Sequence, residues 1–192
     1  MKQANYRWGH PMGEAISKRI IAMGMLAATA LASPVFAGSA DRSQDVRTFV
    51  QSFYDSYVKL ASGEHSLSPS EVVLAKRASV LSPQLFRALK ADDDAARKVP
   101  DEVVGLDFDP FLNTQEEASP CTVGKITLSH GVYMVEVRSK GSTGKQPDVI
   151  AEVGQQSGNL VFVNLIYPGQ GDLLSELKTL AKEREKPSPQ GH

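Results

Sequence analysis

The sequence predicts an α+β fold, in which N-terminal helices pack on a curved, cone-like antiparallel sheet and a C-terminal helix closes the domain. Two observations support this prediction. Apolar residues recur at three- and four-residue spacing before position 100, as in helices, whereas the period changes to two after Pro120, as in strands. Turn sequences separate the strands, and helices that precede such a sheet pack on one of its faces. The sheet is expected to curl around the first helix, which carries the most aromatic residues.

Residues 1–37 have the pattern of a secretory signal peptide. A basic pair is followed by an uncharged apolar stretch (20–32), and Val35 and Ala37 fit the positions before a cleavage site. The apolar stretch is shorter than the roughly 20 residues of a transmembrane helix. We therefore expect cleavage after Ala37, no stable membrane span afterwards, and a periplasmic or secreted protein. Translation could begin at Met1 or at Met12, and the second start would leave a signal of more usual length.

The first helix is predicted at residues 43–62, with a cap at Ser43 or Asp45 and a stop at Gly63. Its apolar stripe consists of Val46, Phe49, Val50, Phe53, Tyr57 and Leu60.

Two shorter helices follow. The sequence 68–71, Ser-Pro-Ser-Glu, is a capping box with proline at the first helical position, and it predicts a helix that continues to about Ser79. Ser82-Pro83 predicts the start of another helix. Its apolar side would consist of Leu85, Phe86, Leu89 and Ala96.

The segment after the helices is irregular. Pro100 breaks the helical pattern, residues 103–106 are compatible with a short strand, and residues 107–113 form a loop with two phenylalanines that should pack against the core.

Four strands are predicted after Pro120, at residues 122–128, 132–138, 149–154 and 160–167. Residues 129–131 and 157–159 have the composition of hairpin turns, and residues 140–146 that of a longer, flexible hairpin loop. Gly171-Asp172 would start the last helix, with Leu173, Leu177, Leu180 and Ala181 on one side. We expect a single domain at residues 38–186 and a disordered tail at 187–192.

Three segments carry a resemblance to a known family: residues 49–55 (FVQSFYD), 81–85 (LSPQL) and 109–111 (DPF). Over residues 46–180 the chain resembles the bacterial envelope family of unknown function that contains the YbjP-type lipoproteins. The resemblance implies a nuclear-transport-factor-like (SnoaL-like) cone. This chain lacks the lipid-acceptor cysteine of the lipoprotein members, so their membrane anchoring is not transferred. The family implies no catalytic residues.

Three polar residues are candidates for ligand binding: Tyr54, Asp107 and Asp109. The two aspartates are two residues apart, so both point to one side of an extended segment, and paired carboxylates can act as acid and base when burial separates their pKa values. His130 could join them. The alternative is that Asp109 caps the turn made by Pro110, that His130 is exposed at a hairpin tip, and that Tyr54 is a core residue with its hydroxyl at the edge.

Other patterns lack the spacing that their chemistry requires. Residues 141–145 (GSTGK) miss the glycine spacing of a phosphate loop and the hydroxyl residue after lysine, so we expect a mobile hairpin loop. Residues 92–94 (DDD) miss the spacing of a calcium loop and are expected on a solvated face. Cys121 is the single cysteine, expected to be buried and inert, with pairing between molecules as the alternative. No catalytic residue, metal or cofactor is expected.

The formal net charge of −1 gives no reason to expect nucleic acid as a partner. These patterns favour an exported, non-catalytic binding or accessory domain of the bacterial cell envelope, with an envelope protein as partner and a homodimer as a further possibility. One alternative is a small-molecule-binding protein or enzyme that uses the concave pocket of the cone. Another is a toxin-neutralising, immunity-type protein.

Overall fold

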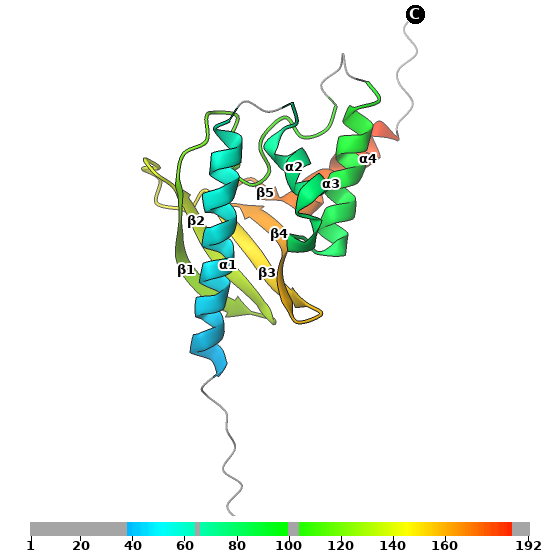
Figure 1. The fold of residues 1–192 in the computed structure, drawn as a ribbon. Helices are drawn as coiled ribbons and strands as arrows, with labels where there is room; N and C mark the ends of the chain where they lie inside the picture. Colours follow the sequence, from blue (N-terminus) through cyan, green and yellow to red (C-terminus); the bar gives the residue numbers. More distant parts are fainter. Residues whose placement is uncertain (1–37, 64–65, 100–103, 186–192) are drawn as a thin grey trace, which may run out of the picture. The chain divides into compact units, whose positions relative to one another are not determined.

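The computed structural model describes residues 38–63, 66–99 and 104–185 (Figure 1). These residues form the predicted α+β fold. The helices are α1 (Gly38–Ala61), α2 (Pro69–Lys76), the 3₁₀ helix η1 (Ala78–Val80), α3 (Pro83–Ala96) and α4 (Leu173–Arg184). The strands are β1 (Cys121–Ser129), β2 (Val132–Ser139), β3 (Val149–Gln156), β4 (Asn159–Tyr167) and β5 (Gly171–Asp172). The predicted signal peptide and C-terminal tail lie outside the described residues.

The five strands form one antiparallel sheet in the order β1-β2-β3-β4-β5, so each strand pairs with its neighbour in sequence. The turns explain this order. His130 and Gly131 have φ angles of 50° and 82°, and Ser157 and Gly158 have φ angles of 50° and 85°, which suit the two-residue turns that fit the twist of a hairpin. Helix α1 crosses the sheet beside β1 and β2, and the open sheet is not closed into a barrel (Figure 1).

One face of α1 and one face of the sheet form the core. Phe53 of α1 is 1% exposed, and its ring centroid lies 4.7 Å from that of Phe162 on β4 and 5.1 Å from that of Phe111. The same cluster includes Val135 on β2 and Leu173 on α4. The period-two pattern of the strands thus places alternate side chains against the helices.

The short helices begin where the sequence predicts. The Ser68 hydroxyl accepts from the Glu71 N–H (3.3 Å), while the Glu71 carboxylate accepts from the Ser68 N–H, so the capping box of α2 is complete. Ser82 caps α3 by accepting from the Leu85 N–H (3.2 Å). The first of these helices ends at Lys76, three residues earlier than expected, because the chain tightens there into η1.

Several local expectations were wrong. Residues 104–106 form no strand; the Leu106 N–H bonds a side chain instead of a neighbouring strand. Asp172 caps α4 as expected, by accepting from the Ser175 N–H (3.1 Å), but residues 171–172 also pair with β4 as a short strand, and Ala181 on α4 is exposed. Helix α1 begins five residues before the expected cap. In the part of the chain that is described, no helix is long and apolar enough to cross a membrane.

The hairpin loop between β2 and β3 is more organised than its composition indicates. The Arg138 guanidinium donates to the carbonyls of Gly144, Lys145 and Gln146 at 2.8–3.0 Å. The Asp148 carboxylate accepts from the Ser139 N–H and the Ser142 hydroxyl. These bonds hold the loop that the sequence predicts to be mobile.

Candidate functional site

The three predicted ligand-binding residues have different environments. Tyr54 is 1% exposed, and its hydroxyl donates to the Phe111 carbonyl (2.9 Å). Asp109 is partly buried, whereas Asp107 is exposed on the surface. The structure therefore separates the two aspartates, because the chain bends at Phe108, between them, and does not run there as an extended segment.

Asp109 organises the segment that follows it. One of its carboxylate oxygens accepts from the N–H groups of Phe111 (2.9 Å) and Leu112 (3.1 Å), and the other accepts from the Tyr57 hydroxyl (2.8 Å). This confirms the interpretation in which Asp109 caps the turn made by Pro110. Burial raises the pKa of Asp109, although the bonds from Tyr57, Phe111 and Leu112 oppose the shift.

Three tyrosine hydroxyls donate to residues 109–111. Besides Tyr54 and Tyr57, the Tyr167 hydroxyl of β4 donates to the Pro110 carbonyl (2.7 Å). We call this group, Tyr54, Tyr57, Tyr167 and Asp109, the tyrosine cluster. The sequence did not indicate a polar role for Tyr167 or Tyr57. Tyr167 ends a predicted strand, where period-two alternation marks it only as a core residue, and Tyr57 belongs to the apolar stripe of the first helix.

The tyrosine hydroxyls of the cluster make structural hydrogen bonds to the segment 109–111. Burial raises the pKa of Tyr57 and Tyr167 far above the usual value, and the Asp109 carboxylate adds to both shifts. Burial also raises the pKa of Tyr54. A general base should have a pKa near the working pH, and these hydroxyls are moved away from it. Among the described residues, no buried side-chain nitrogen or oxygen lacks a hydrogen-bond partner.

His130 does not approach the tyrosine cluster. It lies exposed at the β1–β2 turn, as the alternative interpretation predicts, and its Nδ1 lies 3.0 Å from the Ser129 hydroxyl.

An open hollow lies instead on the helical surface, between α2, α3 and residues 104–110, with a volume of about 310 Å³. We call it the α2–α3 hollow. Its apolar lining consists of Leu74, Leu89, Ala96, Val104, Leu106, Phe108 and Pro110. Its polar lining consists of Ser68, Ser70, Glu71, Asp92, Asp93 and Arg97.

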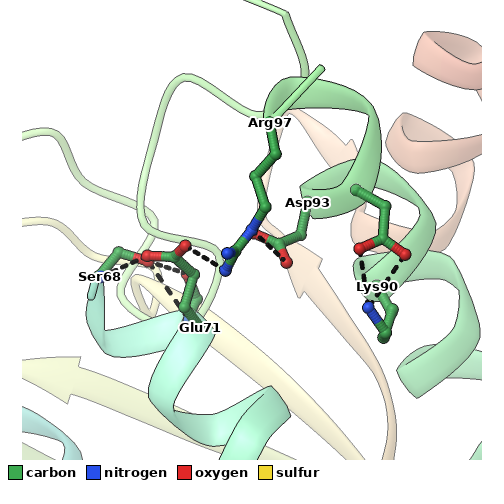
Figure 2. Close-up of polar contacts among 7 residues, drawn as sticks. Ser68, Glu71, Lys90, Asp93 and Arg97 are labelled. Atoms are coloured by element: carbon green, nitrogen blue, oxygen red, sulfur yellow. Dashed lines mark hydrogen bonds and ion pairs between the residues drawn. The ribbon is translucent and has the colours of Figure 1, made fainter. Parts of the chain in front are cut away.

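Arg97 connects the two helices at this hollow (Figure 2). Its guanidinium lies 2.6 Å from the Glu71 carboxylate on α2 and 3.2 Å from the Asp93 carboxylate on α3. The Arg97 side chain is 55% exposed, whereas those of Glu71 and Asp93 are 23% and 19% exposed. Hydrogen bonding to Asp93, with the charges of Asp93 and Glu71, raises the pKa of Arg97. The hollow thus combines an apolar wall with charged side chains of both signs.

Asp92 corrects the expectation that residues 92–94 form a solvated face. It is 6% exposed, lines the hollow, and accepts from the Arg184 guanidinium of α4 (2.6 Å) and from the Leu106 N–H (3.0 Å). The 100° rotation between helical neighbours explains the error, because it turns Asp92 inward while Asp94 stays exposed. Gly105 packs directly against this carboxylate, and an added Cβ there would lie 2.7 Å from it.

Asp92→Ala should lower the free energy of unfolding by about 1–3 kcal/mol, because it leaves the Leu106 N–H and the partly buried Arg184 without their carboxylate. Asp94→Ala is the matched control. It removes an exposed pair with Lys90 and should leave stability nearly unchanged. Urea denaturation of both variants measures the difference, and equal losses would show that Asp92 does not join α3 to α4.

Cys121 is 6% exposed, and its sulfur lies 3.4 Å from the Ser119 carbonyl and 3.8 Å from the Ser139 hydroxyl. Burial raises the pKa of the thiol, which lowers the fraction of reactive thiolate. We therefore predict that a disulfide reagent such as DTNB labels the folded protein at least about tenfold more slowly than the urea-unfolded chain at pH 8. Equal rates would indicate an accessible, reactive cysteine.

In the described ranges, no three His, Cys, Asp or Glu side chains lie close enough together to hold a metal ion. Comparisons with protein-family models, with curated proteins and with solved structures found no match. The resemblance to the envelope family therefore stays a prediction.

Proposed function

We propose that this chain is an exported, non-catalytic binding domain of the bacterial envelope, which contacts a protein partner through its α2–α3 hollow. One observation carries the non-catalytic part of the proposal. The polar groups beneath the sheet are bonded to one another, and the rings of Phe53, Phe111 and Phe162 fill the space between them. A substrate would have to displace the phenylalanine rings to reach the polar groups.

The hollow supports the binding part of the proposal. Its walls offer apolar side chains, which a partner can cover, next to an Arg97 that is already held by two carboxylates. Apolar area gives affinity, and a charged rim gives orientation and specificity. The signal-peptide pattern of residues 1–37 supports export, and the resemblance to an envelope family supports the compartment.

Photocrosslinking in intact cells tests this proposal directly. A benzoylphenylalanine replaces Ala96, which lines the hollow, and in a control strain it replaces Ala75, an exposed alanine on α2 outside the hollow. We expect a discrete crosslinked protein from position 96 in the periplasmic or envelope fraction and none from position 75. Equal crosslinking at both positions, or none at position 96, would contradict the hollow as the docking site.

A further inference from the structure

The edge of the sheet lies outside the α2–α3 hollow. Among the strands of the described residues, β1 is an edge strand, so one side of its backbone has no neighbour there. Helix α1 covers the first part of that edge. Arg47 donates to the carbonyls of Val123 and Gly124 (both 2.8 Å), and Gln51 bonds the Val123 N–H and the Cys121 carbonyl (both 2.9 Å). These two side chains take the place of a neighbouring strand over residues 121–124.

The register of the ladder shows which backbone groups face outward beyond this point. The Val137 carbonyl of β2 accepts from the Asp148 N–H, on the side of β3 (3.0 Å). In an antiparallel sheet every second residue faces the same neighbour, so Val135 and Tyr133 also face β3. Their partners on β1 are Ile126 and Leu128. The N–H and C=O groups of these two residues therefore face away from β2, toward the open edge.

The open part of the edge is also apolar. Leu128 is 59% exposed, and Ile126 is partly buried against the core. Both alternate with polar neighbours, Lys125 and Thr127, which are exposed. No side chain of the described residues bonds the four outward-facing backbone groups. The protection that α1 gives to the first half of β1 thus stops where the exposed leucine begins.

We propose that residues Lys125–Ser129 bind an extended segment of a partner protein as an added strand of the sheet. The backbone groups of Ile126 and Leu128 face outward, and Thr127 between them bonds β2. This alternation is the template that an added strand requires. An apolar side chain of the segment would lie beside Leu128, and an acidic one beside Lys125. The bound segment is about five residues long, because the His130–Gly131 turn ends the edge on one side and Arg47 occupies it on the other.

A short peptide fits this edge better than a second copy of the chain. Stable dimers bury roughly 1,200 Å² or more, which a five-residue edge does not supply. The proposal is independent of the hollow, since no residue of β1 lines it.

The test uses the purified full chain and a phage-displayed library of random heptapeptides, from which enriched peptides are synthesised. We expect apolar residues at alternate positions of these peptides. At saturation, hydrogen exchange of the Ile126 and Leu128 amides should slow at least about tenfold, because they gain hydrogen bonds. The Thr127 amide faces β2 and should not change. Leu128→Lys should weaken binding about tenfold, since it removes the apolar contact, and Leu128→Met should bind like the original protein.

Three results would overturn the proposal: no enrichment of peptides, enriched peptides that leave the Ile126 and Leu128 amides unprotected, or binding that Leu128→Lys does not weaken. If these amides are protected without peptide, and the protection increases with protein concentration, then the edge binds a second copy of the chain and the peptide proposal is wrong. Since Ala96 and Leu128 lie on different surfaces, loss of one binding activity leaves the other measurable.

Discussion

Replacing Phe53 by alanine should lower the free energy of unfolding by about 3–5 kcal/mol. The side chain is 1% exposed and lies against rings of α1 itself, of Phe162 on β4 and of Phe111 in the loop. The Arg77 guanidinium also lies over it, 5.4 Å from the ring centroid. Removing the ring leaves a cavity that rigid neighbours cannot fill. The loss is a large part of a typical total of about 5–15 kcal/mol.

Thermal and urea denaturation followed by circular dichroism measure this loss. Val99→Ala is the control, because Val99 is 37% exposed and should change stability by less than about 0.5 kcal/mol. A Phe53→Ala protein that melts at the same temperature as the original would show that α1 does not bury this face.

Asp109→Ala should cost about 3–5 kcal/mol, because it leaves the Tyr57 hydroxyl and the N–H groups of Phe111 and Leu112 without an acceptor at a buried position. Relief of the buried charge offsets part of that cost. Asp109→Asn should lose less, since the amide oxygen can still accept from the two N–H groups. Asp107→Asn, two residues away and exposed, should leave stability unchanged. Equal effects at the two positions would contradict the role of Asp109.

The raised pKa of Asp109 also predicts a pH dependence. Between the unfolded value of about 3.9 and the higher folded value, the unfolded chain has released the proton while the folded protein keeps it, so stability falls as pH rises. The free energy of unfolding of the original protein, minus that of Asp109→Asn, should therefore decrease with pH in this window and level off above it. An increase would mean that the folded carboxyl is more acidic than the unfolded one.

Periodicity and caps were sufficient to predict most of the fold. The stripe of α1, the capping box at Ser68 and the change of period after Pro120 each depend on residues close together in sequence. The loop at residues 107–113 and the Asp109 cap were predicted from local pattern, but the way residues 104–112 pack against the rest of the domain was not. Their structure depends on partners that are distant in sequence: Asp92 holds Leu106, Tyr57 holds Asp109, and Tyr167 holds Pro110.

The candidate site was harder to predict than the fold for the same reason. Tyr54 and Asp109 both belong to the tyrosine cluster. No short sequence pattern, however, indicates that the hydroxyls of Tyr54, Tyr57 and Tyr167 all donate to the segment 109–111. The α2–α3 hollow depends on Arg97 and Glu71, which are 26 residues apart. The capping role of Glu71 was readable from the sequence, whereas its pairing with Arg97 was not.

The central claim is that the tyrosine cluster closes the space beneath the sheet, so that binding takes place on the outer surface. Detection of tyrosine hydroxyl protons by solution NMR tests it most directly, because a hydroxyl that is buried and bonded exchanges slowly with water. The account predicts slowly exchanging hydroxyl signals from Tyr54, Tyr57 and Tyr167 in the folded protein. Rapid exchange of all three hydroxyls would contradict the account and reveal a water-filled pocket in the position of a ligand site.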